Sequence, residues 1–339
     1  MDKTSEAVHD VQVAKDTTGV GAEQKHKRSR ERIRLLGQRF RILVPFLALL
    51  LLTIVFSLLE PTRFPTWRNA QVILNQSAVL SIVGFGLTFV IVAGGIDLSV
   101  GSVMALAGML AMGVVRDAGL VPGVLTGPAV GLAAGVFNGV VYTYLRIPSF
   151  IVTLGMLTIA RGLTILYSHG AVIIVEGEGP AAQIGLFPTI YYIVLVVFAI
   201  CLVLYNYTRF GRYTQAIGGD ERVAVLTGVP VNRIKLLIYS LCGTLAGLGG
   251  VVLASRVGAA TPTAGMSFEL DAIAAVVVGG TPLTGGIGNI YNTILGTLII
   301  SMLGNGLVIM GVSSEMQMVI KGLVLIGAVF ISLEREKIG

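Results

Sequence analysis

Long apolar runs, separated by short polar or glycine-rich stretches, dominate the chain from about residue 42 to residue 333. A helix needs roughly 20 apolar residues to cross about 30 Å of hydrocarbon. The pattern predicts full spans at 42–59, 71–92, 98–116, 121–145, 149–167, 188–207, 236–255, 289–310 and 317–333. A shorter apolar run, 271–284, is flanked by glycines and predicts a short or re-entrant segment that protein must surround. We therefore expect an all-α polytopic membrane helix bundle of about ten segments, some of them short or broken.

Composition supports lipid as the solvent. Of the 339 residues, 54% are hydrophobic and 12% are charged, whereas a soluble domain carries about 25% charged residues. Cys201 and Cys242 are far apart and both lie in apolar runs, so we interpret them as small buried side chains and expect neither a disulfide nor a metal site.

The distribution of charge predicts the topology. Basic residues crowd the segment from Lys25 to Arg41, directly before the first apolar run. Cytoplasmic flanks of membrane helices carry an excess of Lys and Arg, so we interpret 1–41 as a basic, partly disordered cytoplasmic tail. With an even number of crossings, the connection 209–235 and the C-terminus 334–339 also lie inside, and both carry basic residues. The net charge of +6 then reflects membrane topology and does not indicate nucleic-acid binding.

Three glycines at four-residue spacing, Gly131, Gly135 and Gly139, lie in the span 121–145. Small residues at this spacing let two helix backbones approach closely in a membrane. We expect this face to pack against another helix.

Asp97 is the only charged residue between Arg68 and Arg116. A lone carboxylate in hydrocarbon is costly, so it must lie near the interface or be held by partners. Gly94 and Gly95 can break the preceding helix, which would make Asp97 the N-cap of the next one. A contact with a transported solute is the alternative, and a broken helix beside a pathway is compatible with both.

The connection 209–235 is the longest charged internal segment, and DERVAVL within it can form a short helix between Gly219 and Gly228. We interpret it as a rigid cytoplasmic handle for a separate motor, with a solvated loop as the alternative. No phosphate-binding loop, zinc-peptidase motif or nucleophile elbow occurs in the chain. The sequence therefore predicts that the chain is not an enzyme.

Few polar side chains lie within the predicted spans. Neutral amides suit an uncharged, polyhydroxylated solute, although such side chains also form hydrogen bonds between helices. Arg161 and Lys321 are expected to reach the interface or pair with a carboxylate. Because Asp97 is almost the only carboxylate expected inside the membrane, a proton- or sodium-coupled carrier is disfavoured.

Five ordered blocks cover most of the chain and resemble the permeases of bacterial ABC sugar importers, close to the ribose-transporter type, within the superfamily of branched-chain amino acid and ribose permeases. They are GGIDLSVGSVMALAG at 94–108, FIVTLGMLTIARGL at 150–163, GRYTQAIGGDERVAVLTGVPVNRIKLLIYSLCG at 211–243, TAGMSFELDAIAAVVVGGTPLTGGIGNI at 263–290 and GVSSEMQMVIKGLVLI at 311–326.

The resemblance implies a type II-like importer permease domain over 42–333 in the bacterial inner membrane. It implies a second permease copy or a paralogue, a cytosolic subunit that binds ATP and Mg²⁺, and a periplasmic sugar-binding protein. It also implies alternating access for a ribose-like pentose, a hexose or a polyol, and a coupling helix at the ATP-binding subunit. The residues expected to make that coupling are Asp220, Glu221, Arg222 and Gly228.

Two further groups of residues are expected from this interpretation. The expected gate and pathway residues are Gly94, Gly95, Asp97, Ser99, Asn75, Asn138, Gly279, Gly280 and Asn305. The hypothesised docking residues for the binding protein, all predicted on the outer face, are Arg63, Arg68, Arg116 and Arg256. A permease for branched-chain amino acids and a carrier that works without an ATPase are the alternative functions.

Overall fold

The computed structural model describes residues 44–175 and 179–338. The chain divides into two compact units, Met1–Leu47 and Ala48–Gly339, and nearly all of the described residues belong to the second unit. The predicted tail 1–41 lies outside the described residues. The first described helix, Val44–Leu59, begins in the last residues of the first unit and matches the predicted span 42–59.

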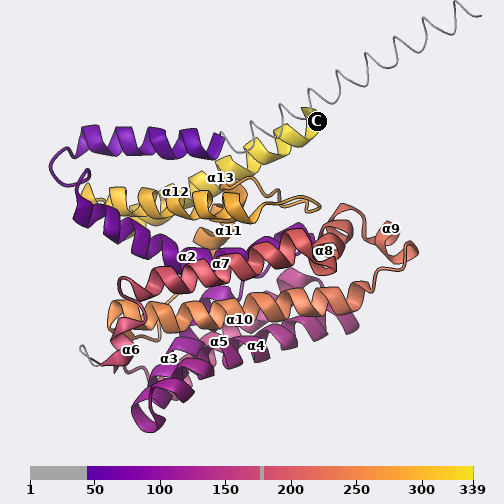
Figure 1. The fold of residues 1–339 in the computed structure, drawn as a ribbon, viewed down its shortest axis with the longest axis horizontal. Coiled ribbons are helices and arrows are strands. Elements are labelled where there is room, and N and C mark those ends of the chain that lie inside the picture. The colour runs from indigo at the N-terminus through magenta and orange to yellow at the C-terminus, as the bar shows by residue number, and fades with distance from the viewer. Residues whose placement is uncertain (1–43, 176–178, 339) are drawn as a thin grey trace, which may run out of the picture. The chain divides into compact units, whose positions relative to one another are not determined.

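The second unit is almost entirely helical (Figure 1). Its longer helices are α2 (Trp67–Val92), α3 (Val100–Ala118), α4 (Leu120–Tyr144), α5 (Ser149–Ser168), α7 (Thr189–Tyr207), α10 (Val231–Val257), α12 (Ile290–Ile309) and α13 (Ser314–Ile338). Its shorter helices are α6 (Pro180–Gln183), α8 (Arg209–Gly219), α9 (Glu221–Leu226) and α11 (Phe268–Val278). Two short strands, β1 (Ile173–Ile174) and β2 (Ala259–Ala260), pair antiparallel, with Ile173 opposite Ala260.

Within the described residues, seven helices are long and apolar enough to cross a membrane: α2, α3, α4, α5, α7, α10 and α12. The prediction of a polytopic membrane helix bundle is confirmed in this form. The run 271–284 is helical only to Val278, and α11 begins at Phe268, before the run itself. At 1.5 Å per residue α11 is roughly 16 Å long, about half the hydrocarbon thickness.

Burial separates a central helix from peripheral ones. In α2, 89% of the most apolar stretch is buried, against 22% in α4 and 22% in α7. Side chains of α2 such as Phe85 and Phe89 are fully buried, whereas Leu195 on α7 is 61% exposed. Lipid tails are as apolar as leucine, so the exposed faces of α4, α5 and α7 are suited to contact lipid.

The most extensive contact between helices joins α4 to α10, which lie along each other (Figure 1). A Cβ added to Gly131 would overlap the carbonyl oxygen of Gly243, and one added to Gly243 would overlap the carbonyl oxygen of Gly131. Gly135 and Gly139 face the next turns of α10 in the same way. The predicted close-packing face of span 121–145 is confirmed, and its partner is α10.

Two opposite ends of the bundle can be defined by contacts. One end of the bundle carries α9, and there the segments around Val92, Gly218 and Gly286 contact one another. We refer to this end as the α9 end. At the other end, the hydroxyl of Ser255 near the end of α10 donates to the carbonyl of Ala181 in α6, and we refer to this as the α6 end.

Candidate functional site

A buried polar cluster lies where α2 ends and α3 begins, at the α9 end. The backbone N–H and the hydroxyl of Ser99 both donate to Oδ1 of Asp97, at 2.9 and 2.6 Å. The amide of Asn138, on α4, donates to the Ser99 hydroxyl at 3.0 Å. All three side chains are 1% exposed. The structure therefore brings together three predicted pathway residues, although Ser99 and Asn138 are 39 positions apart in the sequence.

The predicted N-cap role of Asp97 is wrong in detail. Helix α3 begins at Val100 and its N-cap is Ser99, whose side chain makes no capping hydrogen bond. Asp97 instead accepts from the backbone two residues on, which is a local Asx turn within the non-helical connection 93–99. The predicted break is present, because α2 ends at Val92 and Gly94 has φ +76.

A second break follows α11. Its C-cap is Gly279, and a Cβ on this glycine would lie 2.6 Å from the carbonyl oxygen of Asn292 on α12. Gly280 has φ +97, so the chain turns away from the helix axis here. The connection 279–289 then returns to the α9 end, where the N–H of Gly286 donates to the carbonyl of Val92 at 2.8 Å. The two predicted gate segments thus meet each other.

The short helix predicted within 209–235 is present as α9, but the segment as a whole is largely helical and is not a loop. Most of its first half is α8, which ends at Gly219. Asp220 then caps α9, and its carboxylate accepts from the N–H groups of Arg222 and Val223 at 2.8 and 3.1 Å. Gly228 follows with φ +82, which ends the helical geometry.

Helix α9 carries apolar side chains on its exposed face. Val223 is 53% exposed, Val225 is 56% exposed and Leu226 is 85% exposed, whereas Ala224 is buried against the bundle. Helix α8 is fixed tightly beneath it, because a Cβ on Gly218 would overlap both the Val92 carbonyl oxygen and the Gly286 nitrogen. The exposed helix is therefore attached directly to the point where both breaks meet.

Two other predicted pathway residues lie apart from this cluster. Asn75, on α2, accepts a hydrogen bond from the Tyr191 hydroxyl of α7 at 2.8 Å. At 1.5 Å per residue it is roughly 25 Å along α2 from Val92. Asn305, on α12, is 5% exposed, and its side-chain oxygen has no hydrogen-bond partner among the residues described.

The four arginines predicted on the outer face divide into two groups. Arg63 and Arg68 are exposed, and Arg116 is exposed and paired with the neighbouring Asp117 at 2.8 Å. Arg256 is half-buried at the end of α10, and its Nε atom is buried without a hydrogen-bond partner in the described part of the chain.

Two acidic residues on α11, Glu269 and Asp271, were not singled out from the sequence. Lys321 of α13 forms an ion pair with Asp271 at 2.6 Å, which is one of the two roles predicted for this lysine. Arg161 of α5 donates to the carbonyls of Pro262 and Ala264 at 2.5 and 2.9 Å, and Glu269 also interacts with this guanidinium. The prediction that Asp97 stands nearly alone is wrong. The available signal was the ELDA sequence directly before the apolar run.

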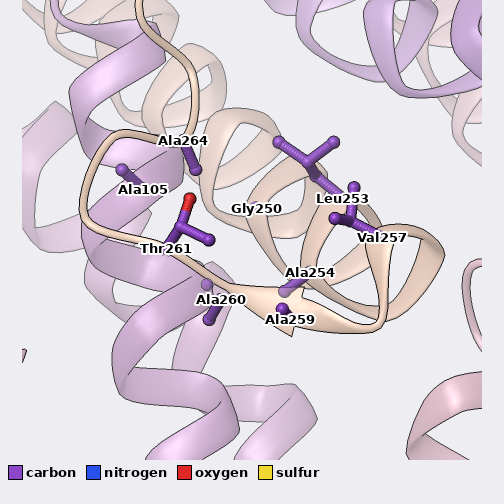
Figure 2. Close-up of a pocket in the computed structure, with 10 residues that line it drawn as sticks. Ala105, Gly250, Leu253, Ala254, Val257, Ala259, Ala260, Thr261 and Ala264 are labelled. Carbon is purple, nitrogen blue, oxygen red and sulfur yellow. The ribbon is translucent and has the colours of Figure 1, made fainter. Parts of the chain in front are cut away.

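A small cavity of about 120 Å³ lies between α3, α10 and the segment 259–264 (Figure 2). Small apolar residues line most of it, and the hydroxyl of Thr261 is the one polar side-chain group among its lining residues. None of the predicted pathway residues lines it. A polyhydroxylated solute needs several hydrogen-bonding partners, so this cavity does not fit one.

Comparisons with known proteins match this chain to permease components of transport systems. The family model described as the branched-chain amino acid transport system permease component matches residues 69–329. The ribose import permease protein RbsC of Bacillus subtilis (strain 168) is 44% identical over 86% of this chain and 92% of its own length. The D-allose transport system permease protein AlsC of Escherichia coli (strain K12) is 37% identical over 84% of this chain and 89% of its own length.

The fructose import permease protein FrcC of Rhizobium meliloti is 36% identical over 85% of this chain and 84% of its own length. No solved structure matches the chain. The matched segment begins in α2, ends in α13 and contains both breaks and α9. This chain belongs to the family of the branched-chain amino acid transport system permease component, and it is a multi-pass membrane permease.

Proposed function

We propose that this chain is the permease subunit of an ATP-driven ABC importer that carries a monosaccharide across the bacterial inner membrane. The observation that carries the proposal is the 44% identity with a ribose import permease over 92% of that protein's length. Relatives named for fructose and allose are also similar over most of their length. The substrate class is therefore a ribose-like pentose, a hexose or a related polyol.

In this proposal the energy comes from a separate cytosolic subunit that binds ATP and Mg²⁺. The exposed apolar side chains of α9 form the docking surface, with Asp220, Glu221, Arg222 and Gly228 setting the geometry of that helix. Three neighbouring apolar side chains in water are costly unless a partner covers them. A second permease copy or a paralogue completes the transporter.

The α9 end then faces the cytoplasm, together with both termini, and the α6 end faces the periplasm. The basic residues of 209–235 agree with this orientation. Counting Val44–Leu59, α11 with its flanking segments and α13 gives ten crossings in a type II-like arrangement. A periplasmic sugar-binding protein would dock on the arginines at the α6 end, with the exposed Arg63, Arg68 and Arg116 available for acidic partners.

Transport would proceed by alternating access. ATP binding moves α9, and α9 moves the two connections that meet at Val92 and Gly286. The gate glycines Gly94, Gly95, Gly279 and Gly280 allow these connections to turn, and Asp97, Ser99 and Asn138 hold the first of them. Asn75 and Asn305 would offer amide groups to the solute elsewhere along the path.

Reconstitution into liposomes tests the proposal. The chain is purified together with an ATP-binding subunit and a sugar-binding protein of the same transporter, and uptake of radiolabelled ribose is measured with ATP inside or outside the vesicles. We expect uptake that requires all the subunits and ATP on the α9 side, with competition from unlabelled fructose and allose. Uptake by this chain alone would contradict an ATP-driven importer and favour a self-contained carrier.

A permease for branched-chain amino acids is the second candidate, because the matching family model is described in those terms. Competition by leucine but not by ribose in the same vesicles would favour it. The sugar permeases among the relatives favour the first candidate.

A further inference from the structure

Lys235 is a buried cation in the first turns of α10. The residue is 7% exposed, and lysine is rarely buried to this degree unless it is paired. Its ammonium group donates to Oε2 of Glu221 at 2.7 Å. Glu221 is the first residue of α9, and its side chain is 52% exposed. The lysine therefore ties the exposed α9 to the interior of the bundle.

The same ammonium group contacts a second element. It lies 4.6 Å from the centroid of the Tyr142 ring, near the end of α4, which is a cation–π contact. The Tyr142 ring in turn packs edge to face against Tyr239 of α10, with ring centroids 5.4 Å apart. Lys235 thus connects Glu221 of α9 with the Tyr142 ring of α4, which packs against Tyr239.

Tyr239 carries this series of contacts to the first break. Its ring is 2% exposed, and its hydroxyl donates to the carbonyl of Ile96 at 3.3 Å. Ile96 directly precedes Asp97, whose carboxylate holds the connection 93–99 through Ser99. An unbroken set of contacts therefore runs from Glu221 on α9 to the connection between α2 and α3.

We propose that Lys235 is a positioning residue that transmits movement of α9, through Tyr142 and Tyr239, to the connection 93–99. This inference rests on the proposed function, in which α9 is moved by an ATP-binding subunit. Stability alone does not explain a cation here, because well-packed apolar side chains often replace a buried ion pair without loss. A hydrogen-bonded ion pair adds a fixed direction, and its half-exposed Glu221 can move with α9 while still holding Lys235.

The test uses the complete transporter in liposomes, with sugar uptake and ATP hydrolysis measured together. Lys235→Met keeps an unbranched apolar side chain as far as the ε position and removes the ammonium group with its charge. We expect ATP hydrolysis to stay within about twofold of the unmodified complex while sugar transported per ATP falls about tenfold. Lys235→Arg should retain most of this ratio, because it keeps the cation for both Glu221 and Tyr142. The matched control is Arg146→Met, which removes an exposed cation between α4 and α5.

A second pair of variants tests the ring contacts. Tyr142→Phe keeps the ring and should keep the ratio, whereas Tyr142→Leu should lower it about as much as Lys235→Met does. If Lys235→Met subunits do not assemble, the two Tyr142 variants still test whether these contacts transmit the movement. A normal ratio in Tyr142→Leu or Lys235→Met overturns the proposal, and so does failure of both to assemble, because the residues would then serve the fold itself. If the unmodified complex shows no ATP-dependent uptake, the proposed function has failed, which is a separate result.

Discussion

The N–H of Gly286 donates to the carbonyl of Val92 at 2.8 Å, which joins the connection after α11 to the end of α2. These residues are far apart in the sequence, and each lies at a break in helical structure. Gly218 of α8 lies against both, so the segment that carries α9 touches the two breaks at once. Helix α8 therefore contacts both connections directly.

Enlarging Gly218 should separate these elements. In Gly218→Ala the new methyl group overlaps the Val92 carbonyl oxygen and the Gly286 nitrogen, so we expect a loss of about 1–3 kcal/mol of stability and impaired uptake. Thermal unfolding of the purified chain in detergent measures the first effect. Gly219→Ala is the matched control, because nothing lies within 4 Å of a Cβ at that position. Equal unfolding temperatures for the two variants would contradict the close contact.

The Asp97 carboxylate should be replaceable by an amide but not by a methyl group. Asp97→Asn keeps an oxygen at Oδ1 for both Ser99 donors, so the fold should be retained. Asp97→Ala leaves the Ser99 N–H and hydroxyl without this acceptor, at a cost of about 1–3 kcal/mol. The two variants are compared by unfolding and by uptake. Normal stability with lost uptake in Asp97→Asn would indicate that the negative charge itself serves the pathway.

The ion pair between Asp271 and Lys321 should stabilise the packing of α11 against α13. The side chains of Asp271 and Lys321 are 21% and 31% exposed, so the pair is neither fully exposed nor fully buried. Breaking an exposed pair costs up to about 1 kcal/mol of stability, and breaking a buried pair costs about 3 kcal/mol or more. We therefore expect Asp271→Asn to lower the free energy of unfolding by about 1–3 kcal/mol. Lys321→Met and the double variant complete a double-mutant cycle. A coupling free energy near zero would show that the two side chains do not depend on each other.

Leu226 should contribute to docking of the ATP-binding subunit. It is 85% exposed on α9, and Leu226→Ser removes apolar surface that we expect the partner to bury. The dissociation constant should rise about tenfold, which is about 1.4 kcal/mol. Binding is measured with the purified partner and the permease in nanodiscs. Leu145→Ser is the control, since Leu145 is 65% exposed at the same end, between α4 and α5. The same loss in both variants would argue against α9 as the docking element.

The arginines at the α6 end should differ in their effects. Arg63→Glu and Arg68→Glu reverse exposed charges and should slow association with an acidic binding protein, more strongly at low salt than at high salt. Arg256→Glu should lower stability as well, because it places a carboxylate at a half-buried position where, among the described residues, no polar partner bonds the Arg256 Nε atom. Association rates over a range of salt concentrations and unfolding of each variant separate the two effects. Unchanged association in all three would remove these residues from the docking surface.

Helix positions were predictable from the sequence because lipid imposes a long apolar run on each span. The predicted spans 71–92 and 149–167 lie within a few residues of α2 and α5. Flanking glycines predicted α9, since the DERVAVL run lies between Gly219 and Gly228, and the structure adds that Asp220 caps the helix. Pairs of polar side chains that meet across the bundle could not be predicted in the same way. Asp271 and Lys321 are 50 positions apart, and neither local sequence indicates which residue the side chain will contact.

The sequence by itself determined that the chain is a membrane helix bundle, where the helices break, and that α9 exists, because hydropathy, glycine and capping residues act over a few neighbouring positions. Only the tertiary structure decided that Asp97 and Ser99 meet Asn138, that both breaks join at Gly218, and that Lys235 lies between α9 and Tyr142. Those contacts depend on which helix faces pack together. That choice is made by shape and hydrogen bonding across the whole bundle, since in lipid apolar side chains alone favour no particular partner.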